Sequence, residues 1–524
     1  MAVMKNIRGF INIGEHQTRE LNLTISVAWR IIIGLFLAAL SGVLLTAAFS
    51  PYNQWYFIFI AFIPMVIAQY RILPLKYCAF ASATTNLVWL ALYFGPMFFF
   101  VDGAPIYMKL LPLIGFALAI LTEKGFRRFH DQTDYKWFVM HGVANWIWFE
   151  FIRTLIPGLG TWGFVGYTLW SQRWFLFPIS IVGIYGLNFV IMIANYSLAA
   201  FIISLLDKRI RMDTLVPISK RRGYLHIFIS AALLITWISS SLIIQHVREK
   251  EVSQQNTIRV VAVQPGTTEV AFSNPDMDQQ SRLSLLTDIT KQTKSFAAHL
   301  IVWPELVLNF DPEIRFVEQF KDLAADMDAY LVLPYGLLED GHMRNEVKVL
   351  SPAGVFHPLY SKTHPVSFAG EQRGPNWGAF PVHSTSFGQL GTIICYDLNY
   401  TDVTRIMAKN GAQIISVPSN DWPGIVEKQN IHLVFRAIEN NMSLVKAESA
   451  YDSAVISPLG EIIAETVSYE PMQDNIVTEV KLGTAEPTIY SIVGDIVGWI
   501  MFVLGFAFMW MEGYVNKKPK KRKE

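Results

Sequence analysis

The chain has 524 residues, enough for two or three domains of ordinary size. Hydrophobic residues make up 52% of it and charged residues only 16%, and its mean hydropathy is +0.33. This composition is too apolar for a soluble enzyme of this length and is typical of a protein partly embedded in a membrane. A formal net charge of +1 gives no reason to expect a nucleic-acid partner, because such binding needs a concentrated basic face.

Eight apolar runs approach or exceed the length of about 20 residues that a helix needs to cross a bilayer. In chain order they lie at 28–49, 54–70, 77–97, 106–122, 137–156, 174–205, 225–245 and 489–511. We therefore expect a bundle of about eight transmembrane helices, with seven before a long polar block and one after it. The first run is expected to be an uncleaved span, because it follows about 27 mixed residues and is long enough to cross the membrane.

Basic residues are concentrated in alternate connections between these runs. The connections after the second, fourth and sixth runs contain two, four and six Lys or Arg residues, and the segment after the last run contains six. The intervening short connections carry only Arg173. Because cytoplasmic loops are enriched in Lys and Arg, both termini are predicted to be cytoplasmic and residues 246–488 extracytoplasmic. A soluble core of eight helices would not be expected to concentrate Lys and Arg in alternate loops.

The polar block changes to short runs rich in β-branched residues, with helical intervals between several of them. Strands are predicted at 258–264, 300–305, 329–336, 347–351, 390–397, 412–419 and 442–447. This alternation predicts a layered α/β domain with functional groups where strands end. The expected organisation is a seven-span bundle over 1–245, the α/β domain over 246–488, and a last helix with a basic tail over 489–524.

The chain has two cysteines, Cys78 in an apolar run and Cys395 in the polar block. Two thiols so differently placed indicate neither a disulfide framework nor a zinc site. No metal or organic cofactor is expected, because the sequence has neither a cluster of ligands nor a Gly-rich phosphate loop.

Three segments at or near predicted strand ends each carry one chemically capable side chain: Glu305, Lys362 and Cys395. A thiol that attacks an acyl carbon needs a base for its proton and a cation for the developing oxyanion. We expect Cys395 to attack, Glu305 to relay the proton and Lys362 to stabilise the tetrahedral intermediate. Taken singly, each residue also has a structural interpretation, as a buried thiol, a helix cap or a solvated lysine.

The segments around these residues resemble the signature segments of the nitrilase superfamily. They are WPE at 303–305, YSKTHPVSFAGE at 360–371 and ICYDLNYTD at 394–402. The resemblance implies an αββα sandwich with a Glu305, Lys362 and Cys395 triad, and it makes Glu371 the match for a second glutamate near the lysine. A serine in place of an expected proline and one extra residue before Glu371 depart from the usual lysine segment.

The apolar half resembles the bacterial apolipoprotein N-acyltransferases. The similarity lies in FSPYNQWYF at 49–57, WFEFIRTLIPGLGTWGFVGYTLWSQ at 148–172, IVGIYGLNFVI at 181–191 and TIYSIVGD at 488–495, together with SNDWPG at 419–424 and RAIE at 436–439. It implies a multi-pass protein of the bacterial inner membrane with an outward-facing nitrilase-like domain. The implied reaction takes an acyl chain from a membrane phospholipid onto Cys395 and passes it to the α-amine of a diacylglyceryl-cysteine lipoprotein. We expect the protein to be a monomer.

Two other functions stay open at this point. A membrane-anchored amidase of the same superfamily would use the same triad to hydrolyse an amide, and a non-catalytic lipoprotein-binding protein would not need the triad at all. Asp397, where the acyltransferases commonly have Glu, and the stretch at 446–460, which lacks their Asn-Thr-Gly pattern, mark a divergent member.

Further residues are expected to support the site. Those in the matching segments are Glu371, Tyr396, Asp397, Trp422, Arg436, Glu439, Glu150 and Arg153. The last two lie three apart on a predicted span, so they can pair with each other, either as a structural clasp or as support for the active-site loops. The aromatic candidates for a water-excluding lining are Trp422, Trp377, Phe368, Trp162 and Trp170, which are otherwise typical of a membrane interface or a core.

Overall fold

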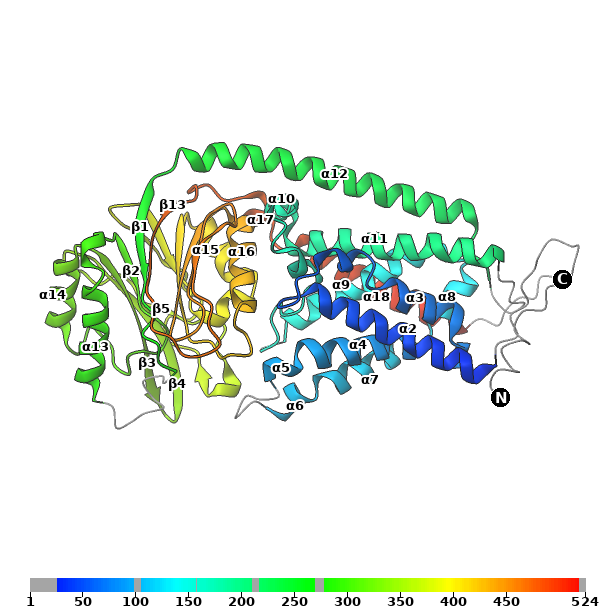
Figure 1. Cartoon of the computed structure of the whole chain (residues 1–524), viewed down its shortest axis with the longest axis horizontal. Coiled ribbons are helices and arrows are strands. Elements are labelled where there is room, and N and C mark those ends of the chain that lie inside the picture. Colours follow the sequence, from blue (N-terminus) through cyan, green and yellow to red (C-terminus); the bar gives the residue numbers. More distant parts are fainter. Residues whose placement is uncertain (1–25, 99–104, 157, 210–215, 269–277, 518–524) are drawn as a thin grey trace, which may run out of the picture.

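A computed structural model describes residues 26–98, 105–156, 158–209, 216–268 and 278–517 of the chain. A helical bundle forms one end of the molecule and two β-sheets form the other (Figure 1). The basic tail predicted after Lys517 lies outside the described residues, as does part of the basic connection before α12, at 210–215.

Each of the eight predicted apolar runs contains helix. The main helices are α2 (Val27–Ala48), α3 (Ile63–Ile67), α4 (Phe80–Tyr93), α7 (Leu111–Glu123), α9 (Phe138–Thr154), α11 (Ile179–Arg209), α12 (Lys220–Ser253) and α18 (Ile496–Lys517), and short helices α5 (Gly95–Phe98), α6 (Ile106–Lys109), α8 (Phe126–Gln132), α10 (Arg173–Leu176) and α17 (Ile489–Val493) lie beside them. Helix α3 is extended by a 3-10 turn and a π-turn into one helical stretch over Trp55–Ile72.

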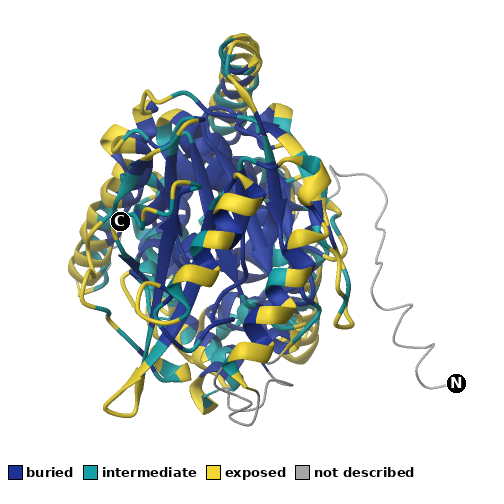
Figure 2. Cartoon of the chain, turned by 90° about the vertical axis from the view of Figure 1, so that its left-hand side faces the viewer, coloured by how far each residue is buried: buried dark blue, intermediate teal, exposed yellow. Residues whose placement is uncertain are grey.

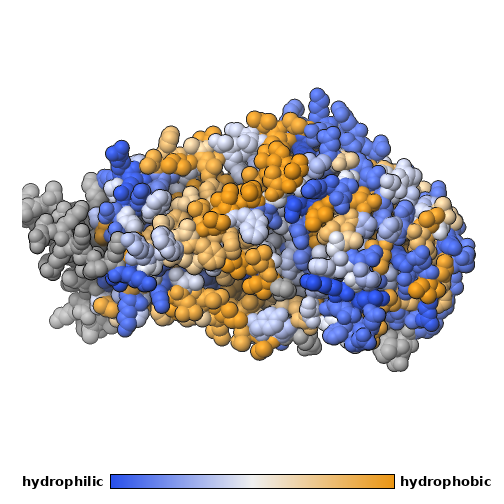
Figure 3. Space-filling model, turned by 180° about the vertical axis from the view of Figure 1, so that it is seen from behind, coloured by the Kyte–Doolittle hydropathy of each residue, from blue (hydrophilic) through white to orange (hydrophobic). Residues whose placement is uncertain are grey.

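Five helical stretches in the described part of the chain are long and apolar enough to cross a membrane. They are Val27–Ala48, Trp55–Ile72, Ile179–Asp207, Lys220–Ser253 and Ile496–Lys517. Helices α4, α7 and α9, at the other three predicted runs, are shorter, with 14, 13 and 17 residues. Seen from behind, hydrophobic side chains cover much of the bundle between a hydrophilic end and the hydrophilic α/β part (Figure 3).

Glycines interrupt two of the predicted runs. Gly183 has φ +66° and ψ −178° within α11, and Gly494 has φ +66° between α17 and α18. A Cβ at Gly183 would lie 2.4 Å from Cε2 of Tyr490, so this position needs both the missing side chain and the left-handed backbone. Helix α12 is longer than predicted, with 34 residues, and it continues past the bundle to the sheets (Figure 1).

The α/β part contains two sheets. The first has the order β13-β1-β2-β3-β4-β5, with β6 beside β4, and the second has the order β12-β11-β10-β9-β8-β7. The bounds are β1 (Thr257–Ala262), β2 (Leu300–Val302), β3 (Tyr330–Glu339), β4 (His342–Leu350), β5 (Tyr360–Ser361), β6 (Glu371–Gln372), β7 (Val382–Ser384), β8 (Gln389–Thr392), β9 (Ile414–Ser419), β10 (Ser443–Glu448), β11 (Ala454–Ile456), β12 (Ile462–Glu465) and β13 (Ile476–Lys481). All seven predicted strands are confirmed, and the six additional strands are mostly short.

The sheets face each other and helices cover their outer faces, as expected of an αββα sandwich. Within β1, Val260 belongs to the core between the sheets, while Val261 packs with the helices α13 (Gln279–Lys291) and α14 (Val317–Met327). Helices α15 (Asp402–Lys409) and α16 (Lys428–Asn440) lie between the second sheet and the bundle (Figure 1). Burial on both faces gives the strands their continuous apolar runs, and Figure 2 shows the buried strands behind helices with exposed outer faces.

Candidate active site

Residues that follow strand ends in both sheets meet in one buried site. Glu305 follows β2 by three residues, Lys362 follows β5 directly, and Cys395 follows β8 by three. The two sheets are joined here because Glu305 N–H donates to the Ser419 carbonyl at 3.3 Å. In return, the Asn420 N–H donates to Oε2 of Glu305 at 3.0 Å. The carboxyl ends of parallel strands are where α/β folds place their functional groups.

Lys362 lies between two carboxylates. Its Nζ is 2.8 Å from Oε1 of Glu305 and 3.0 Å from Oε1 of Glu371. Asn345 on β4 donates to the same two oxygens, at 2.6 and 2.9 Å. The other oxygen of Glu371 accepts from the Val366 N–H at 2.6 Å. Glu371 therefore reaches the lysine despite the extra residue before it, and the three buried charges are paired as buried charges must be.

Cys395 begins a 3-10 turn, Cys395–Asn399, which two residues separate from the end of β8. Its φ of +41° is unusual for a residue with a side chain, and such backbone strain is often found at functional sites. The thiol is buried, with 7% of the residue exposed, and Sγ lies 3.7 Å from Oδ1 of Asp421. The Cys395 carbonyl accepts from the Gln429 amide at 3.2 Å, which holds the turn against α16.

The charges around the thiol affect its titration in opposite directions. Burial, Glu305 and Asp421 raise the pKa of Cys395 well above its usual value, while Lys362 opposes them. Burial also raises the pKa of Glu305, against the pull of Lys362. Although burial lowers the pKa of Lys362, the two neighbouring carboxylates outweigh it and raise that pKa well above its usual value. The resting site therefore favours a neutral thiol and a cationic lysine.

Asp421 is part of a second charge cluster that sequence analysis missed. Its Oδ2 lies 2.5 Å from Nζ of Lys446, which is also 2.8 Å from Asp452. Glu448 accepts the Asp421 N–H at 3.0 Å. A signal was available for Asp421, which lies two residues after the predicted strand 412–419, where a functional group is expected. Lys446 lies inside predicted strand 442–447, where its charge was not considered.

Asp397 ties the turn of the expected nucleophile, Cys395–Asn399 (the nucleophile turn), to the lysine segment at 360–371. Its carboxylate accepts from the Tyr360 hydroxyl at 2.7 Å, from the His364 N–H at 2.7 Å and from the Ile394 N–H at 3.1 Å. All three donors belong to the protein itself, so this buried carboxylate holds the turn against the neighbouring segment. Tyr396 packs edge-on against Tyr400, with ring centroids 5.6 Å apart.

The aromatic candidates do not form a single lining. Trp422 donates from Nε1 to the Met97 carbonyl at 2.9 Å, so it joins the α/β part to the bundle. Trp377 is 44% exposed and stacks under Arg373. Trp162 is buried against His432. Of the others, Phe368 is half-buried and Trp170 donates to the Asn53 side chain at 2.9 Å.

Glu150 and Arg153 attract each other electrostatically, but within the described part of the chain their hydrogen bonds go to the loop before α10 and to α11. Glu150 accepts from the Val165 N–H at 3.2 Å and from the Asn188 amide at 2.7 Å. Arg153 donates to the Trp162 carbonyl at 3.0 Å. Their expected pairing is therefore an electrostatic attraction without a direct hydrogen bond among the described residues, because the loop folds back over α9 and supplies hydrogen-bond partners to both.

The loop held in this way contacts the nucleophile turn. Thr161 donates to the Asn399 carbonyl from its N–H at 2.9 Å and from its hydroxyl at 2.8 Å. The Gly158 N–H donates to the Tyr400 hydroxyl at 3.1 Å. Of the two interpretations given above for Glu150 and Arg153, this geometry favours support for the active-site loops.

Arg436 and Glu439 lie where α16 meets the bundle. They pair with each other, and Arg436 donates to the Tyr167 hydroxyl at 2.7 Å. Glu439 accepts from the Ile184 N–H at 3.0 Å, a donor freed by the break at Gly183. Among the described residues, no group of three or more His, Cys, Asp or Glu side chains is arranged to hold a metal ion.

Comparison with known proteins identifies both halves of the chain. Residues 41–197 match the family model for the apolipoprotein N-acyltransferase N-terminal domain, and residues 258–490 match the model for carbon-nitrogen hydrolases. An amidase of known structure from Nesterenkonia sp. is similar to part of the chain, with 21% identity and a TM-score of 0.36, over 45% of this chain and 92% of that one.

The similar full-length proteins agree with these matches. An apolipoprotein N-acyltransferase of Geobacter metallireducens is 24% identical over 505 residues, which cover 88% of this chain and 92% of that protein. Apolipoprotein N-acyltransferase 1 of Treponema denticola is 24% identical over 569 residues, which cover 93% and 98%. Because two family models match successive parts of the chain and these relatives align over nearly their whole length, the chain belongs to the apolipoprotein N-acyltransferase family.

Proposed function

We propose that this protein transfers an acyl chain from a membrane phospholipid, through a thioester on Cys395, to the N-terminal amine of a diacylglyceryl-cysteine lipoprotein. The observation that carries the proposal is the buried Glu305 and Lys362 pair beside a free, buried thiol, in a chain whose bundle matches the apolipoprotein N-acyltransferase family. Hydrolysis of an amide is the weaker alternative, because it leaves the match of the bundle unexplained.

In the first half-reaction, Glu305 accepts the thiol proton as Sγ of Cys395 bonds to the acyl carbon of the phospholipid. Lys362 stabilises the oxyanion of the tetrahedral intermediate, since its charge is held by two carboxylates. Collapse of the intermediate breaks the ester C–O bond, and Glu305 returns the proton to the departing lysophospholipid. Because the thiol is neutral in the resting site, its proton is transferred during the attack and not in an earlier step.

In the second half-reaction, the lipoprotein amine attacks the thioester carbon. Glu305 takes a proton from the amine, the new C–N bond forms, and the C–S bond breaks. The leaving thiolate of Cys395 regains its proton from Glu305, which completes the cycle. A site whose charged groups are buried keeps water from competing with the amine.

We propose that the bundle has eight spans, with both termini in the cytoplasm and residues 246–488, the catalytic domain, on the outer side of the inner membrane. The start of α2 and the end of α18 lie together at the bundle end remote from the sheets (Figure 1), where the basic connections are expected. Acyl chains hold both substrates in the membrane. A site at the membrane surface therefore avoids a transfer free energy of about 0.8 kcal/mol for each CH₂ group that would otherwise enter water. All groups of the site come from one chain, so a monomer is sufficient.

The test incubates the purified protein, reconstituted in vesicles, with a phospholipid labelled in its acyl chain. Intact-mass analysis is expected to find an acyl adduct in the wild type and none in Cys395→Ser. Addition of a diacylated lipopeptide is expected to discharge the adduct and give labelled triacyl product. Free fatty acid or ammonia as the only product would contradict the proposal in favour of a hydrolase, and an adduct on Cys395→Ser would exclude the thiol.

A further inference from the structure

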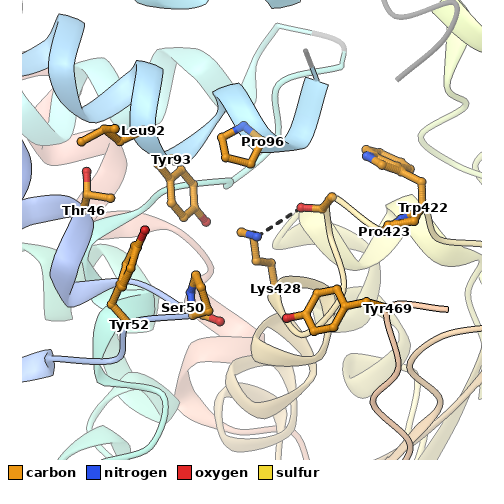
Figure 4. A pocket seen from close by; sticks show the side chains of 12 residues that line it. Thr46, Ser50, Tyr52, Leu92, Tyr93, Pro96, Trp422, Pro423, Lys428 and Tyr469 are labelled. Carbon is orange, nitrogen blue, oxygen red and sulfur yellow. Dashed lines mark hydrogen bonds between the residues drawn. The ribbon is translucent and has the colours of Figure 1, made fainter. Parts of the chain in front are cut away.

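A cavity of about 550 Å³ lies at the junction of the bundle and the α/β part. Its bundle side is formed by the end of α2 with the following turn, and by α4 and α5; its other side is formed by the segment 422–428 and Tyr469. The volume is in the range of about 300–1,000 Å³ that is typical of small-ligand sites. Figure 4 shows the lining side chains converging from both parts of the molecule.

The cavity is next to the catalytic thiol but separate from the triad. Trp422 lines it, and the preceding residue, Asp421, lies 3.7 Å from Sγ of Cys395. Hydroxyl groups of Thr46, Ser50 and three tyrosines also belong to the lining. The tyrosines at its edge, such as Tyr52, which is 60% exposed, suit the depth of lipid headgroups.

Lys428, the first residue of α16, is the basic residue among the lining side chains. Its Nζ donates to the Gly424 carbonyl at 3.1 Å, a neutral acceptor (Figure 4). Within the described part of the chain it forms no ion pair. The neighbouring Glu427 carboxylate attracts Lys428 electrostatically, but its hydrogen bonds go to the Ser50 hydroxyl at 3.0 Å and the Tyr469 hydroxyl at 3.1 Å.

Partial burial of an ammonium group that forms no ion pair costs free energy unless an anion binds to it. Burial lowers the pKa of Lys428, and Glu427 opposes that effect only in part. The buried lysines of the catalytic site, by contrast, each have two carboxylate partners. Some of the lining hydroxyl groups donate to groups of the protein itself, namely those of Thr46, Ser50 and Tyr469. The cavity therefore offers an anionic ligand chiefly the Lys428 cation, with Tyr52 at its edge.

We propose that this cavity binds the phosphate of the phospholipid donor, with Lys428 as the group that holds it. The inference rests on the proposed function and adds to it the group that recognises the donor headgroup. Of the two lipid substrates, the donor carries a phosphate diester and the diacylglyceryl group of the acceptor does not. Lys428 therefore acts in the first half-reaction and distinguishes the donor from the acceptor by charge.

The test compares two acyl donors in the formation of the Cys395 adduct: phosphatidylglycerol in vesicles, and a p-nitrophenyl fatty ester, which lacks phosphate. Lys428→Met keeps the length of the side chain and removes its charge. We expect the ratio of the phospholipid rate to the ester rate to fall by about 10- to 100-fold, the usual effect of one charged hydrogen bond. Lys428→Arg should keep most of the ratio. Lys409→Met, at the exposed end of α15, is the matched control.

The outcomes separate the possibilities. An unchanged ratio in Lys428→Met, or an equal fall with both donors, would overturn the proposal, the latter because it indicates a structural role. If inorganic phosphate slows acylation of the wild type but not of Lys428→Met, while the phospholipid dependence of Lys428→Met is normal, Lys428 binds free phosphate and the lipid assignment is wrong. Failure of the wild type to form an adduct with either donor would contradict the proposed function itself.

Discussion

At the scale of single residues, the site is a balance of buried charges around one thiol. Lys362 is shared by Glu305 and Glu371, and Lys446 is shared by Asp421 and Asp452. Each lysine offsets two carboxylates that could not be buried alone. Cys395 lies between the clusters, since it interacts electrostatically with members of both. Its reactivity therefore depends on which of these charges is present.

Glu305→Gln removes the proposed base while keeping the size of the side chain. The rate of adduct formation on Cys395 is expected to fall by about 10²- to 10⁴-fold. In the wild type the rate should fall as pH is lowered through the pKa of Glu305, because the protonated acid cannot accept the thiol proton. Burial raises that pKa, so the fall should occur above the ordinary range for glutamate. Adduct formation followed by mass spectrometry across pH measures both effects.

The control for this variant is Glu318→Gln, whose side chain is 79% exposed in an ion pair with Lys321. It should leave the rate and its pH dependence as in the wild type. A Glu305→Gln protein that forms the adduct at the normal rate would exclude Glu305 as the base.

Asp421→Asn tests the second cluster. Asp421 raises the pKa of Cys395, so removing its charge should lower that pKa and move alkylation of the thiol by iodoacetamide to lower pH. The pH at half-maximal alkylation rate is the measurement. Asp326→Asn, in the exposed pair with Lys294, is the control and should leave it unchanged. A shift to higher pH in Asp421→Asn would contradict this account, because it would mean that Asp421 and Lys446 together do not raise the pKa of Cys395.

At the scale of elements, the bundle and the sandwich are joined by backbone groups that irregular segments leave free. The break in α11 at Gly183 releases the Ile184 N–H, which donates to Glu439 on α16 at 3.0 Å. The loop before α10 presents Thr161 to the nucleophile turn. Regular helices satisfy their own backbone groups, so contacts of this kind need an interruption.

Gly183→Ala tests the break in α11. The backbone conformation there, φ +66° and ψ −178°, is essentially restricted to glycine and costs other residues about 1–3 kcal/mol. The added Cβ would also meet the Tyr490 ring at 2.4 Å. We expect a lower midpoint of thermal unfolding in detergent and a lower rate of acyl transfer.

Gly513→Ala is the matched control, because nothing lies within 4 Å of a Cβ added there in α18. It should leave the midpoint unchanged or raise it slightly, since alanine favours the helix by up to about 1 kcal/mol. A Gly183→Ala protein as stable as Gly513→Ala would contradict the account of the break.

At the scale of the whole molecule, the α/β part lies at one end of the bundle and the helix ends that border the basic segments lie at the other (Figure 1). The hydrophobic surface of the bundle lies between them (Figure 3). This arrangement allows the membrane to surround the bundle while leaving the sandwich in water.

The proposed orientation predicts which positions a membrane-impermeant maleimide reaches in intact cells with a permeabilised outer membrane. In a protein in which the two buried cysteines, Cys78 and Cys395, are replaced by alanine, Ser384→Cys on β7 should be labelled. Ser219→Cys, exposed before α12, should be labelled only after the inner membrane is disrupted. The reverse pattern would place the sandwich in the cytoplasm.

Local sequence patterns were sufficient to predict the strands, the helical runs and the three residues Glu305, Lys362 and Cys395, which the structure brings into one site. Hydrophobic runs of a given length favour a strand or a helix whatever their partners are, and each of these residues lies in a short, distinctive segment. The patterns could not predict the breaks at Gly183 and Gly494, because a glycine inside an apolar run is compatible with a continuous helix.

Only the tertiary structure decided which charges meet. The Asp421 and Lys446 pair and the hydrogen-bond partners of Glu150 and Arg153 join different structural elements, and the cavity at Lys428 joins segments far apart in the sequence. The energy of such contacts depends on distance and on how far each group is removed from water. Neither quantity is present in a local pattern, so the sequence determined the elements and the reactive residues, and packing determined their electrostatic environment.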